Sequence, residues 1–251
     1  MSTPTSAESL IRLMDMAETL PSAVALRTRS YELLELDAGA RVVDAGCGTG
    51  RAVVELAERG ARAVGVDAAE EMVAAARKRW PVHDFRLGDV YRLPLGDGEV
   101  AGYRADKVLH VLTDAPRALR EARRVLAPGG RIVLIGQDWD TFVIDSDDPR
   151  LTRVIVHARA DLVPDPRVAR RYRNLLLDAG FEQADVEVHT AVFTDETMLP
   201  MLTGLAEAAR AAGAITGEQH AAWTAEQRER ARNGRLFLAL PLFVAIARRP
   251  C

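Results

Sequence analysis

A short glycine-rich segment is the part of the sequence whose residue types and spacing point most directly to ligand binding. Gly46–Gly50 has a glycine at every second position, follows the β-rich run Arg41–Asp44 and precedes a helical pattern. Glycines there let the backbone approach a ligand more closely than a β-carbon would allow. A dinucleotide site needs its third glycine one residue later, and Asp44 is a poor neighbour for a phosphate. The segment predicts a ligand without phosphate groups, with an ammonium group beside Asp44.

Two further aspartates follow the next two strands of the pattern. Asp67 stands 21 residues after Gly46, where its carboxylate suits the two hydroxyls of a ribose. Asp89 suits the amino group of an adenine, with Val90 packed on or beside the ring. Taken singly, Asp67 is more often a helix cap, and Asp89 is usually a loop residue. Because neighbouring parallel strands end at one edge of a sheet, the set together predicts an adenosine-type ligand at that edge.

The elements that must position these residues alternate between strand and helix. Short β-rich runs followed by amphipathic segments indicate βαβ units and a six- or seven-stranded α/β sheet. The expected strands are Arg41–Asp44, Ala63–Asp67, Asp84–Leu87, Val100–Val108, Arg131–Gly136, Ala184–Val192 and Leu236–Ala247. The expected helices are Arg51–Arg59, Glu70–Arg79, Ala115–Leu126, Leu151–Val163 and Pro166–Ala179, with a loop over Thr141–Asp148.

Two helical segments lie outside this alternation. We expect residues 1–251 to form a single domain, with N-terminal helices over 8–36 and a helical insert over 195–232 that caps the substrate site. The insert contains Trp223 and the pair Met198 and Met201. Methionines at helical spacing are usually core residues, so only a weak case assigns these side chains to the substrate.

The motifs together resemble the class I methyltransferases that depend on S-adenosylmethionine (SAM), in the broad group that includes ubiquinone/menaquinone-biosynthesis and bacterial natural-product enzymes. The matching segments are Val42–Gly50, Gly65–Asp67 with Met72, Gly88–Val90 through Leu93–Leu95, and Leu119–Gly130. The resemblance implies a Rossmann-like α/β fold, with a mostly parallel seven-stranded sheet, helices on both faces and helical cap additions. It also implies SAM as cofactor and S-adenosylhomocysteine (SAH) as product.

The resemblance further assigns residues to parts of the cofactor. The glycine segment would line the methionine part, Asp67 the ribose and Asp89 the adenine, while backbone near Lys107 would flank the methionine. The implied cofactor-binding residues are Asp44, Gly46, Cys47, Gly48, Gly50, Asp67, Ala68, Met72, Asp89, Val90 and Lys107. The sequence departs from the group at Val100-Ala101, where Phe-Asp usually opens the fourth strand, and at Val111, where the group often has a histidine.

His110, one place before that position, is the candidate catalytic residue. Methyl transfer from a sulfonium needs mainly an aligned nucleophile and exclusion of water, and it needs a base only where the nucleophile must lose a proton. A histidine after the fourth strand would lie beside the cofactor and has an ordinary pKa near 6.5. The alternative is a histidine that only packs against or caps the next helix.

The candidate substrate residues are Trp139 and His157. Trp139 lies in Asp138-Trp139-Asp140, just beyond the fifth strand, and an aromatic ring flanked by acids suits a flat or cationic acceptor. The alternative is an interface aromatic with solvated acids. His157 is a second candidate base, although a histidine on that helix is more often at the surface.

Two arginines offer a positive charge for the carboxylate of SAM. Arg27 and Arg29 lie on the helix that leads toward the first strand, where they would fold over the methionine part. Most arginines on such a helix are simply solvated.

Composition narrows the class of partner. The net charge is −3, the pI is about 6.0 and no basic stripe is visible, which argues against a nucleic-acid partner. The sequence shows no secretory signal, and its longest apolar run, Leu236–Ala247, is too short to cross a bilayer, so we expect a cytoplasmic protein without membrane contact.

With only Cys47 and Cys251, we expect neither a structural disulfide nor a metal site. A homodimer is possible.

These observations leave a ranked set of functions. The first is methylation of a small-molecule acceptor in specialised or quinone-type metabolism. The second is a SAM-binding enzyme of the same fold that catalyses a cyclisation or rearrangement without methyl transfer. An RNA or protein methyltransferase is disfavoured by the missing basic stripe and the missing Asn-Pro-Pro-Tyr-type motif. A NAD-dependent oxidoreductase is disfavoured by the glycine spacing.

Overall fold

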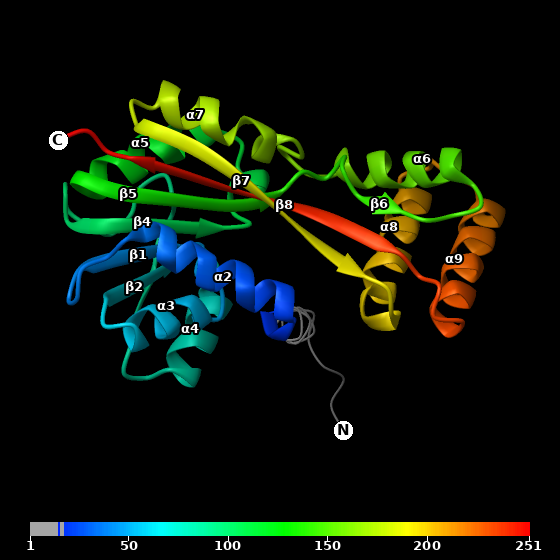
Figure 1. The fold of residues 1–251 in the computed structure, drawn as a ribbon, viewed down its shortest axis with the longest axis horizontal. Coiled ribbons are helices and arrows are strands. Elements are labelled where there is room, and N and C mark those ends of the chain that lie inside the picture. Colours follow the sequence, from blue (N-terminus) through cyan, green and yellow to red (C-terminus); the bar gives the residue numbers. More distant parts are fainter. Residues whose placement is uncertain (1–14, 16–17) are drawn as a thin grey trace.

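A mixed α/β sheet forms the centre of the molecule. The computed structural model describes residue 15 and residues 18–251 (Figure 1). Eight strands lie in the order β3-β2-β1-β4-β5-β8-β6, with β7 on the other side of β8. The parallel strands are β1 (Arg41–Ala45), β2 (Arg62–Asp67), β3 (Asp84–Leu87), β4 (Val100–Asp106) and β5 (Leu126–Gln137). The antiparallel strands are β6 (Val143–Ile144), β7 (Glu182–Phe193) and β8 (Leu238–Arg248). The prediction of a mostly parallel α/β sheet is confirmed.

The number of strands differs from the expected seven because of β6. This strand lies within Thr141–Asp148, which the sequence predicts as a loop. Val143 and Ile144 pair with Ala239 and Leu238, at the end of β8 that extends beyond its pairing with β5. Only two residues take part, so the segment shows no strand period in the sequence.

Helices cover both faces of the sheet, as predicted (Figure 1). Apolar side chains of α5 (Ala115–Val125) and α7 (Tyr172–Asp178) share one core cluster with residues of strands β1, β2, β4 and β5. Side chains of α2 (Pro21–Leu34) and α3 (Arg51–Glu58) share another with Val42, Val133 and Leu242. The helix α4 (Glu70–Arg79) packs beside α3 through Val73 and Ala76.

Helix α2 is the described part of the expected N-terminal helices. It begins at Pro21, because proline has the backbone angle of a first helical turn and needs no hydrogen-bond donor there. It ends at Leu34, and Glu35 follows in a left-handed conformation with φ 46°. Of the expected range 8–36, residues 8–14, 16 and 17 lie outside the described part.

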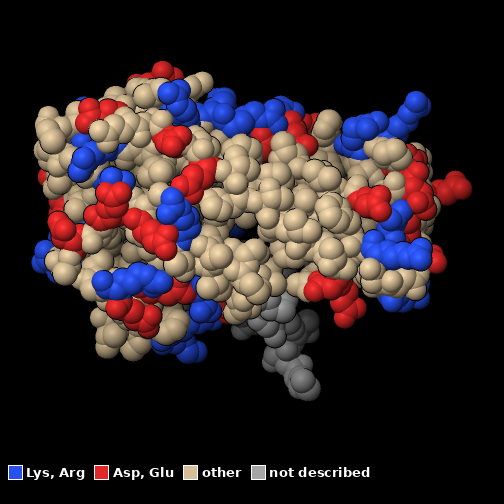
Figure 2. All heavy atoms as spheres, viewed as in Figure 1, with Lys and Arg blue, Asp and Glu red and all other residues tan. Residues whose placement is uncertain are grey.

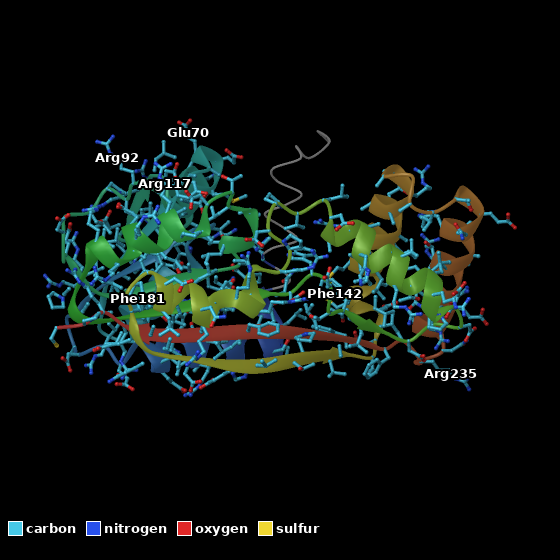
Figure 3. All side chains as sticks on the ribbon, turned by 90° about the horizontal axis from the view of Figure 1, so that it is seen from above. Glu70, Arg92, Arg117, Phe142, Phe181 and Arg235 are labelled. Atoms are coloured by element: carbon cyan, nitrogen blue, oxygen red, sulfur yellow. The ribbon has the colours of Figure 1, made fainter. Side chains whose placement is uncertain are left out.

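A helical unit with its own core lies at one end of the sheet. It contains α6 (Pro149–Ala160), α8 (Leu199–Ala211) and α9 (Gly217–Arg232), and the ribbon of β7 and β8 reaches it from the sheet (Figure 1). Short 3-10 turns are η1 (Leu109–Val111), η2 (Val168–Arg171) and η3 (Glu196–Met198). Phe181 belongs to the core of the sheet and Phe142 to that of the helical unit, and Figure 3 shows them in separate parts of the molecule. The role of this unit as a cap stays a prediction.

The residue Trp223 is the centre of the helical unit. Its side chain is 1% exposed, and its indole Nε1–H donates to Thr152 Oγ1 at 3.0 Å, which joins α9 to α6. Met198 and Met201 pack against the same core. These three side chains therefore have a packing role, which agrees with the weak case for substrate contact.

We expect Trp223→Ala to destabilise the helical unit by about 3–5 kcal/mol, because it removes a buried aromatic side chain and leaves a cavity. Urea unfolding followed by circular dichroism measures the loss. Phe237→Ala is the matched control, since Phe237 is 37% exposed and its removal should cost under about 1 kcal/mol. Equal losses of unfolding free energy in the two variants would contradict the assignment of Trp223 to the core of the helical unit.

Candidate functional site

The predicted ligand-binding residues lie at the edge formed by the carboxyl ends of β1, β2, β3 and β4. The parallel register of these strands brings the glycine turn, Asp67, Asp89 and Lys107 to the same side of the sheet. The space-filling view shows a hollow near the middle of the molecule, between helix α2 and the ribbon of β7 and β8 (Figure 2). The edge of an open parallel sheet is where such folds bind ligands.

The glycine turn is held in place by Asp67. Gly48 N–H donates to Asp67 Oδ2 at 2.8 Å, and Ala69 N–H donates to Asp67 Oδ1 at 2.9 Å. The backbone amides of Gly46 and Cys47 donate to Val66 O. Each oxygen of Asp67 keeps a further lone pair, and the side chain is partly exposed. Asp67 therefore orients the turn and still has acceptors to offer a ribose.

The glycines are required by the protein's own packing as well as by close approach to a ligand. Gly46, Gly48 and Gly50 have φ of 75°, 52° and 88°, which is the left-handed region. A β-carbon at Gly46 would collide with Val108 Cγ2, and one at Gly50 would collide with the Phe85 ring. The G-x-G-x-G spacing thus has a structural explanation beside the functional one.

Cys47, within the turn, and Met72, on α4, are both buried. Cys47 packs with Val53, Val73 and Phe85, and burial raises the pKa of its thiol far above the ordinary value. A thiol with a raised pKa stays protonated and is a poor nucleophile or metal ligand. Among the described residues no group of His, Cys, Asp and Glu side chains is arranged to hold a metal ion.

Asp44 has a partner that the sequence prediction missed. Its carboxylate accepts a hydrogen bond from Arg104 Nη1 at 2.7 Å, and the side chains of Asp44 and Arg104 are 3% and 2% exposed. The two residues stand opposite each other on β1 and β4. The expectation of Asp44 beside a ligand ammonium therefore needs correction, since its charge is already neutralised by the guanidinium. The feature of the sequence that could have indicated this partner is Arg104 itself, an arginine in the middle of an otherwise apolar strand.

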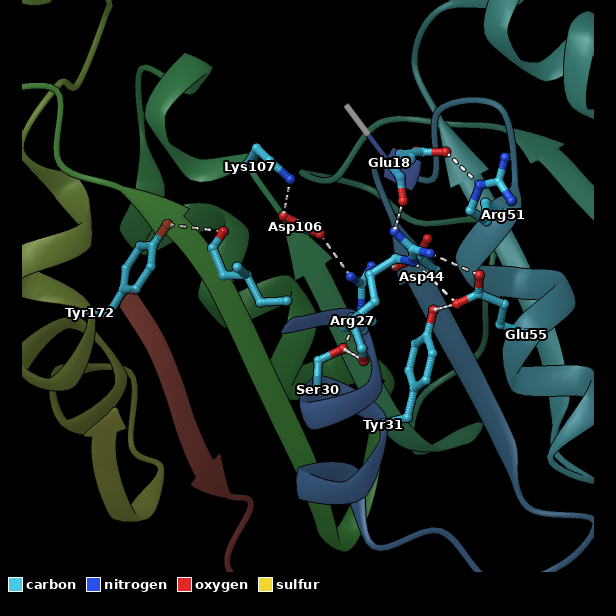
Figure 4. A network of polar contacts seen from close by, with 12 residues as sticks. Glu18, Arg27, Ser30, Tyr31, Asp44, Arg51, Glu55, Asp106, Lys107 and Tyr172 are labelled. Carbon is cyan, nitrogen blue, oxygen red and sulfur yellow. Dashed lines mark hydrogen bonds and ion pairs between the residues drawn. The ribbon is translucent and has the colours of Figure 1, made fainter. Parts of the chain in front are cut away.

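A polar network extends from Arg104 to the edge of the sheet (Figure 4). Arg104 Nε donates to Ser30 Oγ at 2.9 Å, and Nη2 donates to Asp106 Oδ2 at 2.8 Å. Lys107 Nζ donates to the other oxygen of Asp106, also at 2.8 Å. Burial opposes ionisation of Asp106, but Lys107 and Arg104 outweigh it and lower its pKa to about 2. Asp106 is therefore a stable anion that links the core to Lys107.

The prediction that Arg27 or Arg29 binds the carboxylate of SAM is not supported. Arg27 Nε and Nη2 donate to Glu55, and its Nη1 donates to the backbone oxygen of Glu18 (Figure 4). Arg29 donates to Glu187 on β7 and to Glu32. Both guanidinium groups are satisfied by carboxylates of the chain, because acidic side chains on neighbouring elements reach them.

Asp89 and Val90 follow β3 at the same edge. Asp89 is exposed, and its Oδ1 accepts a hydrogen bond from Tyr91 N–H at 2.9 Å. Its Oδ2 accepts none from the described residues. Val90 is 9% exposed and packs into the main core beside Leu93. A free acceptor beside an apolar wall is the arrangement expected for an adenine.

His110 lies in η1, directly after β4, and is 9% exposed. Its Nδ1 is buried and has no hydrogen-bond partner among the described residues. Burial lowers its pKa to about 4, and the positive charges of Lys107 and Arg159 act in the same direction. The imidazole is therefore neutral at pH 7, so it can accept a proton, although as a weak base.

The side chain of Trp139 lies against His110, with ring centroids 5.6 Å apart. Its buried Nε1 likewise has no partner among the described residues. Arg159 from α6 lies over the indole, with Cζ 4.5 Å from the ring centroid. The structure thus brings together Trp139 and His110, which the sequence analysis named separately as substrate and catalytic candidates, and adds Arg159, which the sequence analysis missed.

The acids that flank Trp139 are paired with arginines. Asp138 binds Arg170 Nε, and Asp140 binds Arg167 Nε. With its acids neutralised and a guanidinium on one face of its ring, Trp139 does not form a site for a cationic acceptor. The prediction that Trp139 and its flanking acids suit a cationic acceptor therefore needs correction.

His157 does not join this group. It is exposed on α6, in a surface groove that Arg150 and Arg153 also line. Residues two positions apart on a helix point to nearly opposite sides, so Arg159 faces Trp139 while His157 faces away. The alternative of a surface histidine fits this placement.

Comparisons with known proteins agree with the geometry. A family model described as a methyltransferase domain matches residues 43–134. An uncharacterised 37.1 kDa protein in a transposon of Streptomyces fradiae is 36% identical over 234 residues, which cover 87% of this chain and 67% of that protein. The chain thus spans about two thirds of that relative's length.

Solved structures show the same fold. The geranyl diphosphate C-methyltransferase of Streptomyces coelicolor A3(2), solved with SAH, aligns over 90% of this chain and 76% of its own, with TM-score 0.55 and 22% identity. The [4+2]-cyclase SpnF aligns over 100% of this chain and 98% of its own, with TM-score 0.57 and 22% identity. At this identity the likeness concerns the fold alone.

We expect Arg104→Met to lower the free energy of unfolding by about 3–5 kcal/mol, because it leaves the buried Asp44 carboxylate without its counter-ion. Chemical denaturation measures the change. Arg131→Met on β5 is the matched control, since Arg131 pairs with the exposed Glu35 and such pairs contribute about 1 kcal/mol or less. A loss in Arg104→Met no larger than in the control would contradict the importance of the buried pair.

We expect His110 to make the fold less stable in mild acid. The unfolded chain protonates this histidine below about pH 6.5, whereas the folded chain resists protonation down to about pH 4, so stability falls as the pH falls between these values. The difference amounts to about 2–3 kcal/mol at pH 4. Between pH 7 and pH 4, the free energy of unfolding of His110→Gln should fall by about 2–3 kcal/mol less than that of the native sequence, as measured by urea unfolding. His83→Gln, at a loop position, should retain the native loss, and identical pH profiles for both variants would refute the prediction.

Proposed function

The chain belongs to the class I SAM-dependent methyltransferases, and we propose that it transfers the methyl group of SAM to a small-molecule acceptor in specialised or quinone-type metabolism. The observation that carries the proposal is the shared edge of β1 to β4, where Asp67 holds a left-handed glycine turn and Asp89 keeps a free acceptor. The cytoplasmic location and a homodimer stay predictions.

The residues at this edge fit SAM. Carboxylate acceptors at Asp67 and Asp89 suit ribose hydroxyls and an adenine amino group, and Val90 offers an apolar wall. Gly46 to Gly50 would lie along the methionine part, together with the backbone of Lys107, which has a φ of 57°. When bound, SAM supplies a methyl group that its sulfonium activates for displacement.

The chain's own contribution to the reaction is to bind and orient the acceptor. His110 and Trp139 line the region beyond β4 and β5. His110 is buried and Trp139 is partly buried, which suits a small acceptor better than the surface of a macromolecule. Basic and acidic side chains are interspersed over the sheet part of the face in Figure 2, which is unlike a nucleic-acid-binding stripe. Among the described residues, no helix has the length and apolar character needed to cross a membrane.

His110 is the residue best placed to take a proton from a hydroxyl acceptor. Its neutral state at pH 7 meets the first requirement of a base, whereas its pKa of about 4 limits its strength. Alignment of the acceptor and exclusion of water therefore supply most of the rate in our proposal. If the acceptor is already ionised, His110 takes no proton and contributes only by packing against the acceptor.

Cofactor binding tests the proposal directly. Calorimetry should show that SAH binds, that NAD binds much more weakly, and that Asp67→Ala weakens SAH binding by about 1–3 kcal/mol through the loss of charged hydrogen bonds. Asp97→Ala is the matched control. Asp97 lies on the loop that precedes β4, is exposed and pairs with Arg124 of α5. Binding of NAD as tight as that of SAH would overturn the proposal.

Product analysis separates methyl transfer from the alternative chemistry. With SAM and a panel of small acceptors, methyl transfer forms SAH and a methylated product in equal amounts, detectable by mass spectrometry. A product formed with no gain of a methyl group and no release of SAH would favour the cyclisation or rearrangement alternative.

A further inference from the structure

Arg159 is a partly buried cation with no anionic partner among the described residues. Its guanidinium Cζ lies 4.5 Å from the centroid of the Trp139 ring. Burial lowers its pKa, which shows that the surroundings disfavour its charge. The neighbouring Arg167 and Arg170, by contrast, each bind an aspartate. A partly buried guanidinium without a carboxylate loses part of its hydration, and an anion beside it would compensate its charge.

Two buried polar atoms beside Arg159 also lack partners. Nδ1 of His110 and Nε1 of Trp139 have none among the described residues, and their rings are 5.6 Å apart. An indole Nε1–H can only donate a hydrogen bond, and a neutral imidazole carries one donor. Buried polar groups in folded proteins are normally satisfied. The group thus combines the unpaired guanidinium of Arg159 with an indole N–H and an imidazole nitrogen that have no partner among the described residues.

The other charges in this region cancel. Arg104 and Lys107 are balanced by Asp44 and Asp106. Asp138 and Asp140 are bound to Arg170 and Arg167. Within the described part of the chain, this leaves the positive charge of Arg159 uncompensated beside the candidate catalytic histidine.

We propose that the methyl acceptor carries a carboxylate, which binds to Arg159 and accepts hydrogen bonds from Trp139 Nε1–H and His110. A planar guanidinium matches a carboxylate in geometry, and a single positive charge matches a monoanion better than a phosphate dianion. The inference rests on the proposed function, because it places the acceptor beside the edge that binds the cofactor.

Nuclear magnetic resonance of the SAH-loaded full chain tests the proposal with benzoate as the probe. The indole N–H signal of Trp139, identified by its loss in Trp139→Phe, should shift saturably with a dissociation constant of about 10 mM or tighter. Benzamide, which has the same shape without the charge, should cause no saturable shift. Phenyl phosphate should bind more weakly than benzoate.

Variants of one helix provide the controls. Arg159→Gln should weaken benzoate binding at least about tenfold, because it removes a charged hydrogen-bond donor. Arg159→Lys keeps the charge and should lose less. Arg153→Gln, on the exposed side of α6, should bind benzoate like the native chain.

The same samples distinguish the two proposals. SAH affinity measured by calorimetry should be unchanged in Arg159→Gln, which also shows that the variant is folded. Absence of SAH binding by the native chain would overturn the proposed function. With SAH bound, equal shifts by benzoate and benzamide, full benzoate affinity in Arg159→Gln, or preference for phenyl phosphate would overturn the carboxylate site alone.

Discussion

The buried ion pair between Asp44 and Arg104 is the constraint on which the arrangement of the site depends. Removing two charges from water costs several kcal/mol for each ion, and a close, well-bonded partner must compensate. The pairing of β1 with β4 places the two side chains opposite each other, and Ser30 and Asp106 each accept a further hydrogen bond from the guanidinium. Helix α2, the glycine turn after β1 and the segment after β4 are thereby fixed relative to one another.

The parts of the site that sequence alone could predict are those that the topology of the sheet fixes. Strand ends are recognisable because apolar runs stop at Gly46, Asp67 and Asp89, and parallel pairing then brings those ends to one edge. His110 and Trp139 follow β4 and β5, which are neighbours in the sheet, so their proximity also follows from strand order. No detail of side-chain packing is needed for these conclusions.

What sequence could not predict are the partners of long charged side chains. Arg27 and Arg29 are two residues apart on one helix, yet Arg27 reaches Glu55 on α3 and Arg29 reaches Glu187 on β7. The position of an arginine in the sequence does not indicate which carboxylate lies within reach of its side chain. For the same reason the neutralised acids beside Trp139 and the unpaired Arg159 became visible only in three dimensions. The lowered pKa of His110 has the same origin in part, since burial and the charge of Arg159, 49 residues further along the chain, act together with that of the nearby Lys107.

The division of the molecule into the sheet and the helical unit corresponds to the two binding tasks that we propose. The matched family segment 43–134 contains the cofactor edge and His110, but it ends before Trp139 and Arg159. Trp139 packs against the core of the helical unit, and Arg159 stands on α6 within that unit. Substitutions in the helical unit can therefore change the surroundings of the acceptor without disturbing Asp44, Arg104 or the glycine turn. This explains physically how a shared cofactor edge is compatible with different acceptors, because the residues that we propose recognise the acceptor belong mostly to an element outside the shared part.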